Sequence, residues 1–303
     1  MDAGPVIDAA RGGEPLGAGG PALARVAAPA RAARRATDDP PWVRRTLIGA
    51  AVLFLAAFLL VPAASVLWEA LRGGADVWWK AVSEPDAWAA IKLTLLVAAV
   101  AVPLNTIFGL AAAWSITRFR YRGQNVLLTL IDLPFGVSPV IAGMMTVLLL
   151  GTHGLFGSFL QAHDVKIVFA VPGIVLATVF VTFPFVAREL IPFMQQQGTE
   201  EEEAALVMGA SGWQIFSQVT IPNVRWSLLY GVILCNARAM GEFGAVSVVS
   251  GHIRGLTNTI PLHVEILYSE YAFRASFAVA SLLFLLAVVT LVAKRWMEWK
   301  QRA

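Results

Sequence analysis

Two opposite charges, Arg238 and Glu242, stand four residues apart inside a long apolar stretch of this chain. Residues four apart share a face of a helix, so these side chains can form an ion pair. A charge at the centre of a bilayer costs about 2.5–3.5 kcal/mol on insertion scales, so charges at that depth face protein or water. The two residues are therefore candidates either for a buried ion pair that fixes helix packing or for the lining of an anion path.

A second candidate is Ser138, which lies between Pro134 and Pro139 in another apolar stretch. Proline removes a backbone hydrogen bond from a helix interior, so these prolines predict a kink. Broken helices at membrane depth occur where protein or a water-filled cavity satisfies the freed backbone groups. Freed amides near Ser138 could bind an oxyanion. The alternative is a packing kink in which Ser138 bonds to its own helix.

The longest polar segment between apolar stretches covers residues 198–222. Thr199 and Glu202 have the spacing of a capping box, and the acidic run 200–203 places negative charge at the positive end of a helix. Gly209 can end that helix in the left-handed conformation. We therefore expect a short helix that turns at Gly209.

A second short helix is expected after that turn. Ser211 and Gln214 have the spacing of a second capping box, and Pro222 is expected to end the helix before the next apolar stretch. The two helices would expose apolar side chains, namely Leu206, Met208, Trp213 and Phe216. From the residues alone, the segment is either a solvated helical linker or a docking surface.

Other chemistries lack the residues that they require. The chain contains no Walker A pattern and no plausible nucleophile–His–acid arrangement, so it is not expected to be an enzyme. His153 and His163 share a loop, but their spacing does not resemble a metal site. Cys235 is the only cysteine, which excludes an intrachain disulfide. No metal or cofactor bound by this chain is expected.

The composition indicates a membrane protein. Hydrophobic residues make up 57% of the 303 residues and charged residues only 14%, with a mean hydropathy of +0.68. A soluble domain carries about 25% charged residues, so most of this surface must face lipid. The formal net charge is +3, but the basic residues stand at the ends of apolar stretches rather than on one polar element. That placement indicates membrane topology and argues against a nucleic-acid partner.

Six apolar stretches are long enough to cross a bilayer, which needs roughly 20 residues in a helix. Such continuous stretches exclude the alternating pattern of barrel strands. The sequence therefore predicts an all-α membrane protein with six transmembrane helices, over residues 47–68, 93–117, 126–151, 167–187, 226–250 and 275–293.

The basic residues also predict orientation. With the N-terminus inside, about twice as many Lys and Arg residues fall on the cytoplasmic side, so both termini are expected there. Residues 1–45 are rich in Ala, Gly, Pro and Arg and predict a disordered cytoplasmic extension before a membrane domain over 46–303. Arg44 and Arg45 before an apolar stretch mimic a twin-arginine export signal, but the stretch is too long for a typical cleavable signal, so an uncleaved first span is favoured.

The segment 198–222 resembles the EAA motif of ABC importer permeases, which reads E-A-A, three residues, G, nine residues, I-x-L-P. Glu203, Ala204, Ala205 and Gly209 match it, and Val219 and Ile221 replace the I and L before Pro222. The resemblance implies the type I (MetI-like) permease fold and a coupling loop, 198–222, that docks an ATPase. The docking residues it implies are Glu203, Ala204, Ala205, Gly209, Trp213, Phe216, Ile221 and Pro222.

Within that family, the stretch A-R-x-x-G-E-F-G-A at 237–245 resembles the oxyanion branch. Residues 132–143, 180–190, 209–214, 221–226 and 244–251 are most similar to sulfate permease subunits of the CysW type. The likeness covers residues 47–299. It implies import of sulfate and thiosulfate across the bacterial inner membrane, with Ser138, Arg238 and Glu242 as candidates for the path.

The same resemblance implies the partners and the mechanism. These are an ABC ATPase dimer that uses ATP and Mg²⁺, a second homologous permease subunit, a periplasmic sulfate-binding protein and the surrounding lipid, with transport by alternating access. One alternative is a permease for molybdate or tungstate in the same architecture. Another is a secondary transporter in which Arg238 and Glu242 form an ion relay.

Overall fold

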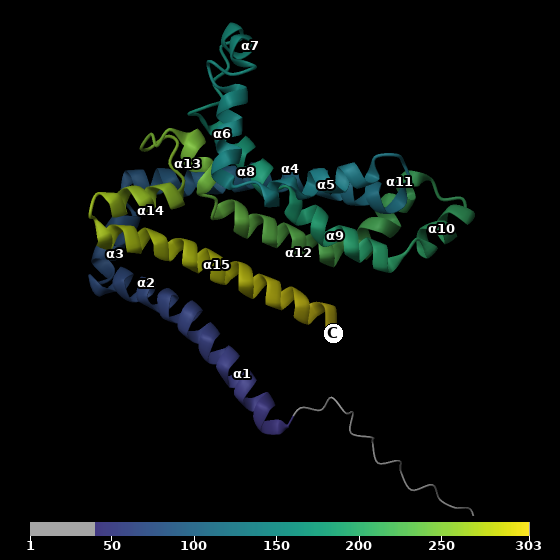
Figure 1. Cartoon of the computed structure of the whole chain (residues 1–303), viewed down its shortest axis with the longest axis horizontal. Helices are drawn as coiled ribbons and strands as arrows, with labels where there is room; N and C mark the ends of the chain where they lie inside the picture. The colour runs from purple at the N-terminus through teal and green to yellow at the C-terminus, as the bar shows by residue number, and fades with distance from the viewer. Residues whose placement is uncertain (1–39, 303) are drawn as a thin grey trace, which may run out of the picture. The chain divides into compact units, whose positions relative to one another are not determined.

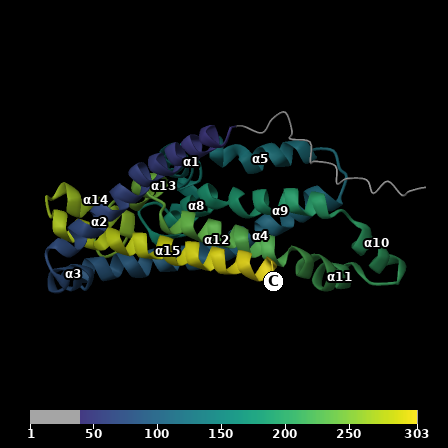
Figure 2. The same cartoon turned by 90° about the horizontal axis from the view of Figure 1, so that it is seen from below.

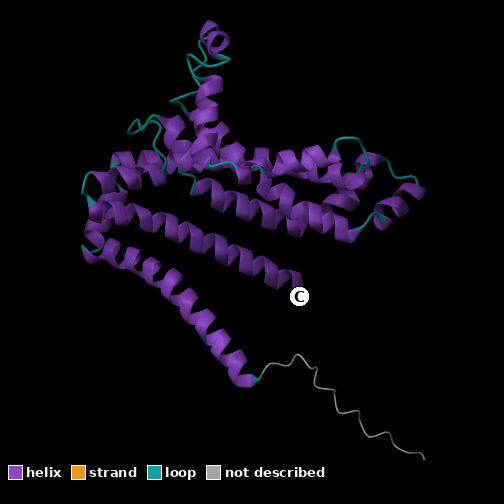
Figure 3. Ribbon diagram, in the orientation of Figure 1, coloured by secondary structure: helices purple, strands orange, loops and turns teal. Residues whose placement is uncertain are grey.

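The computed structural model describes residues 40–302, which form helices and loops, with no strand among them (Figures 1 and 3). Most of the predicted N-terminal extension, residues 1–39, lies outside the described residues, and 41–45 begin the first helix. The chain divides into two units at Phe54. The first unit contains α1 (Pro41–Leu55) up to that residue, and the helices described below belong to the second.

After a π-helical turn at Ala56–Leu60, the second unit begins with α2 (Val61–Arg72). The helices before the coupling loop are α3 (Ala75–Val82), α4 (Pro85–Arg118), α5 (Gln124–Gly136), α6 (Pro139–Leu150), α7 (Gly157–Ala162), α8 (Val171–Thr182) and α9 (Pro184–Gln197). The helices from the coupling loop onward are α10 (Glu200–Val207), α11 (Gly212–Ile215), α12 (Ile221–Met240), α13 (Gly244–Ser250), α14 (Ile260–Ser269) and α15 (Phe273–Arg302).

In the described part of the chain, four helical stretches are long and apolar enough to cross a membrane. They are Pro41–Arg72, Pro85–Arg118, Val171–Gln197 and Phe273–Trp296, and they overlap four of the six predicted spans. The other two predicted spans are broken rather than continuous. The α5–α6 pair bends by 108° and the pair Gly212–Met240 and Gly244–Ser250 by 50°, so there are six spans only if each bent pair counts as one.

The core of the second unit lies where α4, α9 and α12 meet. Two glycines allow this close approach, because a Cβ at Gly109 of α4 would lie 2.8 Å from Val186 Cβ of α9, and one at Gly231 of α12 would lie 3.2 Å from Val186 Cα. Small residues are the usual means by which membrane helices pack closely. Asn105 of α4 also forms a buried hydrogen bond to α8, in which its amide donates to Thr182 Oγ1 at 2.7 Å.

The helices of the second unit give it two distinct ends. Figures 1 and 2 show α10 and α11 at one end and α3 and α14 at the opposite end, with α4, α9 and α12 running between them. We call the end that carries α10 and α11 the coupling end. α15 packs against α2, α3 and α14, and Trp78 Nε1 donates to Ser281 Oγ at 2.9 Å. In Figure 1, α6 and α7 project away from the packed helices.

Candidate functional site

The coupling loop turns at Gly209, as predicted. Gly209 has φ of +88°, a conformation that side chains rarely adopt. Its N–H donates to Leu206 O at 3.0 Å, and the N–H of Ala210 donates to Ala205 O at 3.0 Å. These two bonds form a Schellman motif, which satisfies the last carbonyl groups of α10.

One of the two predicted capping boxes is present. Ser211 N donates to Gln214 Oε1 at 2.8 Å and Gln214 N donates to Ser211 Oγ at 3.4 Å. The box expected from Thr199 and Glu202 is wrong, because Thr199 Oγ1 instead donates to Glu203 Oε1 at 2.6 Å. Glu202 turns toward a buried guanidinium, and a charge-assisted bond is stronger than a bond to a backbone amide.

The expected helix end at Pro222 is also wrong. Residues Gly212–Met240 form one helical stretch, in which a π-helical turn at Phe216–Thr220 joins α11 to α12. Pro222 occupies the first turn of α12. Proline has no N–H to donate, and a π-helical turn just before it changes the hydrogen-bond spacing, so the helix continues through the proline.

Four apolar side chains at the tip of the coupling loop are exposed. Their exposed fractions are 62% for Leu206, 88% for Val207, 82% for Met208 and 74% for Trp213. We call these four residues the tip patch. Phe216, also expected to be exposed, is half-buried because its ring packs on Trp114 of α4, with the centroids 5.1 Å apart. A cluster of exposed apolar side chains on a polar segment is typical of a protein-interaction surface.

The predicted docking residues divide by exposure. Ala205 is buried, and Phe216 and Ile221 are half-buried, so these three hold the loop in shape. The other predicted docking residues are exposed and available to a partner: Glu203, Ala204, Gly209, Trp213 and Pro222. Their docking role stays a prediction.

A buried ion pair that the sequence did not reveal ties α10 to the membrane helices. Arg118 Nε, at the end of α4, lies 2.6 Å from Glu202 Oε2, with side chains only 8% and 14% exposed. Thr220 Oγ1 donates to the other oxygen of Glu202 at 2.7 Å, and Arg118 Nη1 donates to Met194 O of α9 at 3.2 Å. One guanidinium therefore joins the coupling loop to α4 and α9.

The kink predicted at Ser138 is confirmed. α5 ends at Gly136, and Ser138 is the exposed N-cap residue of α6, although its side chain makes no capping bond. The break lies beside Pro139, which occupies the first turn of α6, whereas Pro134 remains inside α5. Binding of an oxyanion at Ser138 stays a prediction.

The Arg238–Glu242 ion pair is also confirmed, with 2.6 Å between Arg238 Nη1 and Glu242 Oε2. The expectation that both lie on one helix is wrong, because α12 ends at Met240 and Glu242 lies in the break before α13. Glu242 is 1% exposed and accepts a bond from Ala245 N at 3.0 Å. Glycine disfavours continuation of a helix, and Gly241 and Gly244 lie on either side of Glu242. The Glu242 carboxylate accepts from the backbone N–H of Ala245, which the helix break leaves without a helical partner.

The two broken spans pack against each other close to their breaks. A Cβ at Gly143 of α6 would lie 2.6 Å from Ala245 O of α13, and one at Gly244 would lie 2.9 Å from Pro139 Cβ. Both glycines are therefore required for α6 and α13 to approach this closely. Pro139 directly follows Ser138, and Gly244 is two residues after Glu242. The contact therefore brings the segments that carry these two predicted path residues close together.

A second ion pair that the sequence did not reveal joins α5 to α9. Arg188 Nε lies 2.8 Å from Asp132 Oδ1, and Arg188 Nη2 donates to Asp132 Oδ2 at 3.3 Å. The guanidinium carbon of Arg188 also lies 4.9 Å from the centroid of the Phe135 ring. Asp132 lies inside the predicted span 126–151 and Arg188 directly follows the predicted span 167–187, so no local spacing connects them.

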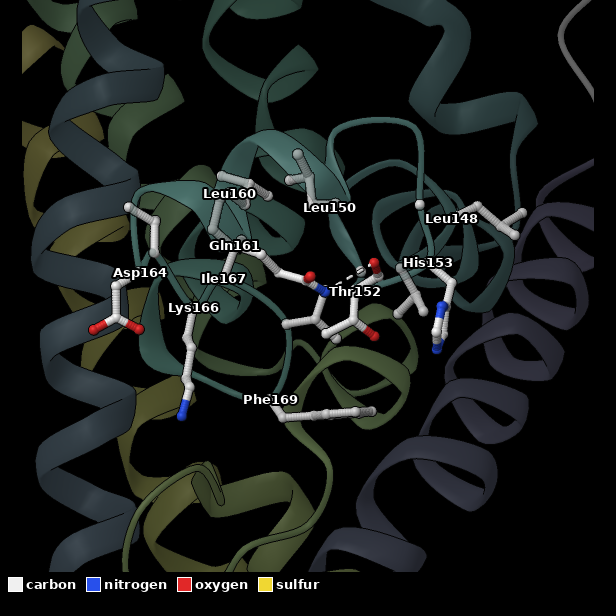
Figure 4. Close-up of a pocket in the computed structure, with 16 residues that line it drawn as sticks. Leu148, Leu150, Thr152, His153, Leu160, Gln161, Asp164, Lys166, Ile167 and Phe169 are labelled. Carbon is white, nitrogen blue, oxygen red and sulfur yellow. Dashed lines mark hydrogen bonds between the residues drawn. The ribbon is translucent and has the colours of Figure 1, made fainter.

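A pocket of about 660 Å³ lies where α6, α7 and the segment before α8 meet (Figure 4). Its lining is mostly apolar, and Gln161 Nε2 donates to Thr152 O at 3.1 Å within it. None of the predicted site residues lines this pocket. Among the described residues, no group of three His, Cys, Asp or Glu side chains could hold a metal ion.

Comparison with known proteins adds a family and close relatives. The family described as "Binding-protein-dependent transport system inner membrane component" matches residues 105–303. The sulfate transport system permease protein CysW of Escherichia coli (strain K12) is 49% identical over 259 residues, covering 86% of this chain and 89% of that protein. CysW of Synechocystis sp. is 51% identical over 256 residues, covering 84% and 93%.

The fold also resembles a solved transporter. A bacterial ABC transporter involved in the import of the acidic polysaccharide alginate matches with a TM-score of 0.71 at 16% identity, over 85% of this chain and 95% of that chain. At that identity the likeness concerns the fold alone.

Proposed function

This chain belongs to the family of binding-protein-dependent transport system inner membrane components, and we propose that it is the permease subunit of an ATP-driven sulfate importer. The observation that carries the proposal is the identity of 49–51% to proteins named as sulfate transport permeases, over most of both chains. Identity at this level across the membrane helices favours a shared cargo over molybdate or tungstate. Thiosulfate, which is also a tetrahedral dianion, is included in the proposal.

The coupling loop is proposed to dock the ATPase. The tip patch offers exposed apolar side chains, and one of them, Trp213, is of a residue type that often contributes a large share of the binding energy at protein interfaces. A permease that depends on a docked ATPase needs no nucleotide site of its own, and the chain has no Walker A pattern. The family name argues against the secondary transporter, since it specifies dependence on a binding protein.

Transport is proposed to follow alternating access. Closure of the ATPase dimer would move the coupling loop, and the Arg118–Glu202 pair would pass that movement to α4 and α9. The breaks beside Ser138 and Glu242 give the spans places where their two halves can move separately. A second permease subunit and a periplasmic sulfate-binding protein complete the proposed assembly.

The cargo is tested by competition. The full complex in proteoliposomes, supplied with its binding protein and ATP, is expected to take up labelled sulfate. Excess unlabelled sulfate or thiosulfate should reduce that uptake, whereas molybdate should have little effect. Competition by molybdate alone, or uptake of labelled molybdate in preference to sulfate, would reassign the cargo.

A further inference from the structure

The ion pair between Arg188 and Asp132 has an unusual environment. The two side chains are 56% and 46% exposed, although they lie on apolar helices. Leu133 and Phe135, which flank Asp132 on α5, are exposed as well. The pair therefore sits on an open, otherwise apolar face of the second unit.

Both members of the pair lie inside helices that are candidate membrane spans. Asp132 is eight residues from the start of α5, about 12 Å at about 1.5 Å per residue. Arg188 is nine residues from the end of α9, about 13 Å from the same coupling end. Charged side chains within a membrane span face a protein partner or a water-filled path rather than lipid.

The chemistry of the pair favours the path. The guanidinium presents Nε and Nη2 side by side to two carboxylate oxygens. Two oxygens of a tetrahedral oxyanion can accept from the same two donors, because the planar guanidinium binds carboxylate and sulfate-like groups in the same bidentate manner. The Phe135 ring, 4.9 Å from the guanidinium carbon, helps to hold the guanidinium in place.

We propose that Arg188 contacts the translocated oxyanion on the half of the path nearer the coupling loop. This inference rests on the proposed function, since it presumes that the cargo is an oxyanion. Between passages, Asp132 occupies both donors and neutralises the guanidinium. The passing anion displaces the carboxylate from these two donors.

The test compares the two members of the pair. Complexes that carry Arg188→Gln or Asp132→Asn are reconstituted, and the initial rate of ATP-dependent sulfate uptake is measured. Arg188→Gln removes the positive charge and the paired guanidinium donors, so the rate is expected to fall roughly tenfold or more, as for loss of a charged hydrogen bond. Asp132→Asn keeps those donors, so its rate should fall by much less.

The pair of Arg72 and Glu69 on α2 provides the matched control. It is also exposed, with 3.4 Å between Arg72 Nη1 and Glu69 Oε2, and Arg72→Gln is expected to leave uptake unchanged. If Arg188→Gln and Asp132→Asn lower the uptake rate equally, the ion pair has a structural role only, and the inference is overturned. Loss of the second permease from the purified Arg188→Gln complex would show a subunit interface instead and would also overturn it.

If the proposed function is wrong, the experiment gives a different result from the one expected if the inference alone is wrong. If wild-type complexes take up no sulfate, thiosulfate or molybdate, the oxyanion cargo is wrong and the inference falls with it. If wild-type complexes transport and Arg188→Gln complexes transport equally well, the inference alone is wrong.

Discussion

Replacing Glu202 with Gln is expected to give a complex that hydrolyses ATP but imports little sulfate. The carboxylate lies 2.6 Å from Arg118 Nε in a site where both side chains are largely buried. Removing one partner from a buried pair costs about 3–5 kcal/mol, because the remaining charge is left unpaired. That cost favours separation of α10 from α4, so ATPase movement would no longer reach the spans. The measurement is sulfate imported per ATP hydrolysed.

Two further variants separate coupling from general damage. Glu200→Gln, on the same helix but exposed, is the matched control and should keep the wild-type ratio. The double variant Arg118→Met with Glu202→Leu removes both charges, and apolar replacement of a buried pair is often neutral or stabilising, so it should recover part of the ratio. A Glu202→Gln complex with the same ratio as Glu200→Gln would show that this pair does not transmit movement.

Changes at the tip of the coupling loop are expected to release the ATPase. Trp213→Ala removes a 74% exposed aromatic anchor, and truncation of such a residue at an interface typically costs about 2 kcal/mol or more. Gly209→Asp forces a side chain into a backbone with φ of +88° and adds a charge to the patch. Both variants should insert into the membrane but lose the ATPase on purification. Glu203→Lys, which reverses a charge at the exposed start of the motif, should do the same.

Leu155 provides the control for that experiment. It is 75% exposed and lies in the loop between α6 and α7, remote in sequence from the coupling loop. Leu155→Ala should therefore retain the ATPase. If Trp213→Ala, Gly209→Asp and Glu203→Lys all purify with the ATPase as wild type does, the ATPase docks elsewhere.

Some local signals in the sequence predicted local structure correctly. Gly209 as a turn and the Ser211–Gln214 capping box are each specified by neighbouring residues, so a short motif was enough to place them. Pro139 likewise marked a kink. The bend of 108° was not predictable, because it depends on how α6 packs against α13.

Interactions between distant residues were not predictable from spacing. Arg188 and Asp132 are 56 residues apart, and Arg118 lies at the end of α4 whereas Glu202 lies in the coupling loop. The mistaken capping box at Thr199 has the same origin, since Glu202 is drawn to a guanidinium that the local sequence does not contain. Phe216 was expected to be exposed because nothing nearby in the sequence indicated the contact with Trp114.

The most direct test of the whole account is the nucleotide dependence of sulfate uptake. In vesicles with the coupling loop facing the ATP compartment, labelled sulfate should enter only when hydrolysable ATP is present, and a non-hydrolysable analogue should not replace it. Uptake at the same rate without nucleotide, driven by an ion gradient, would contradict the account and identify the chain as a secondary transporter.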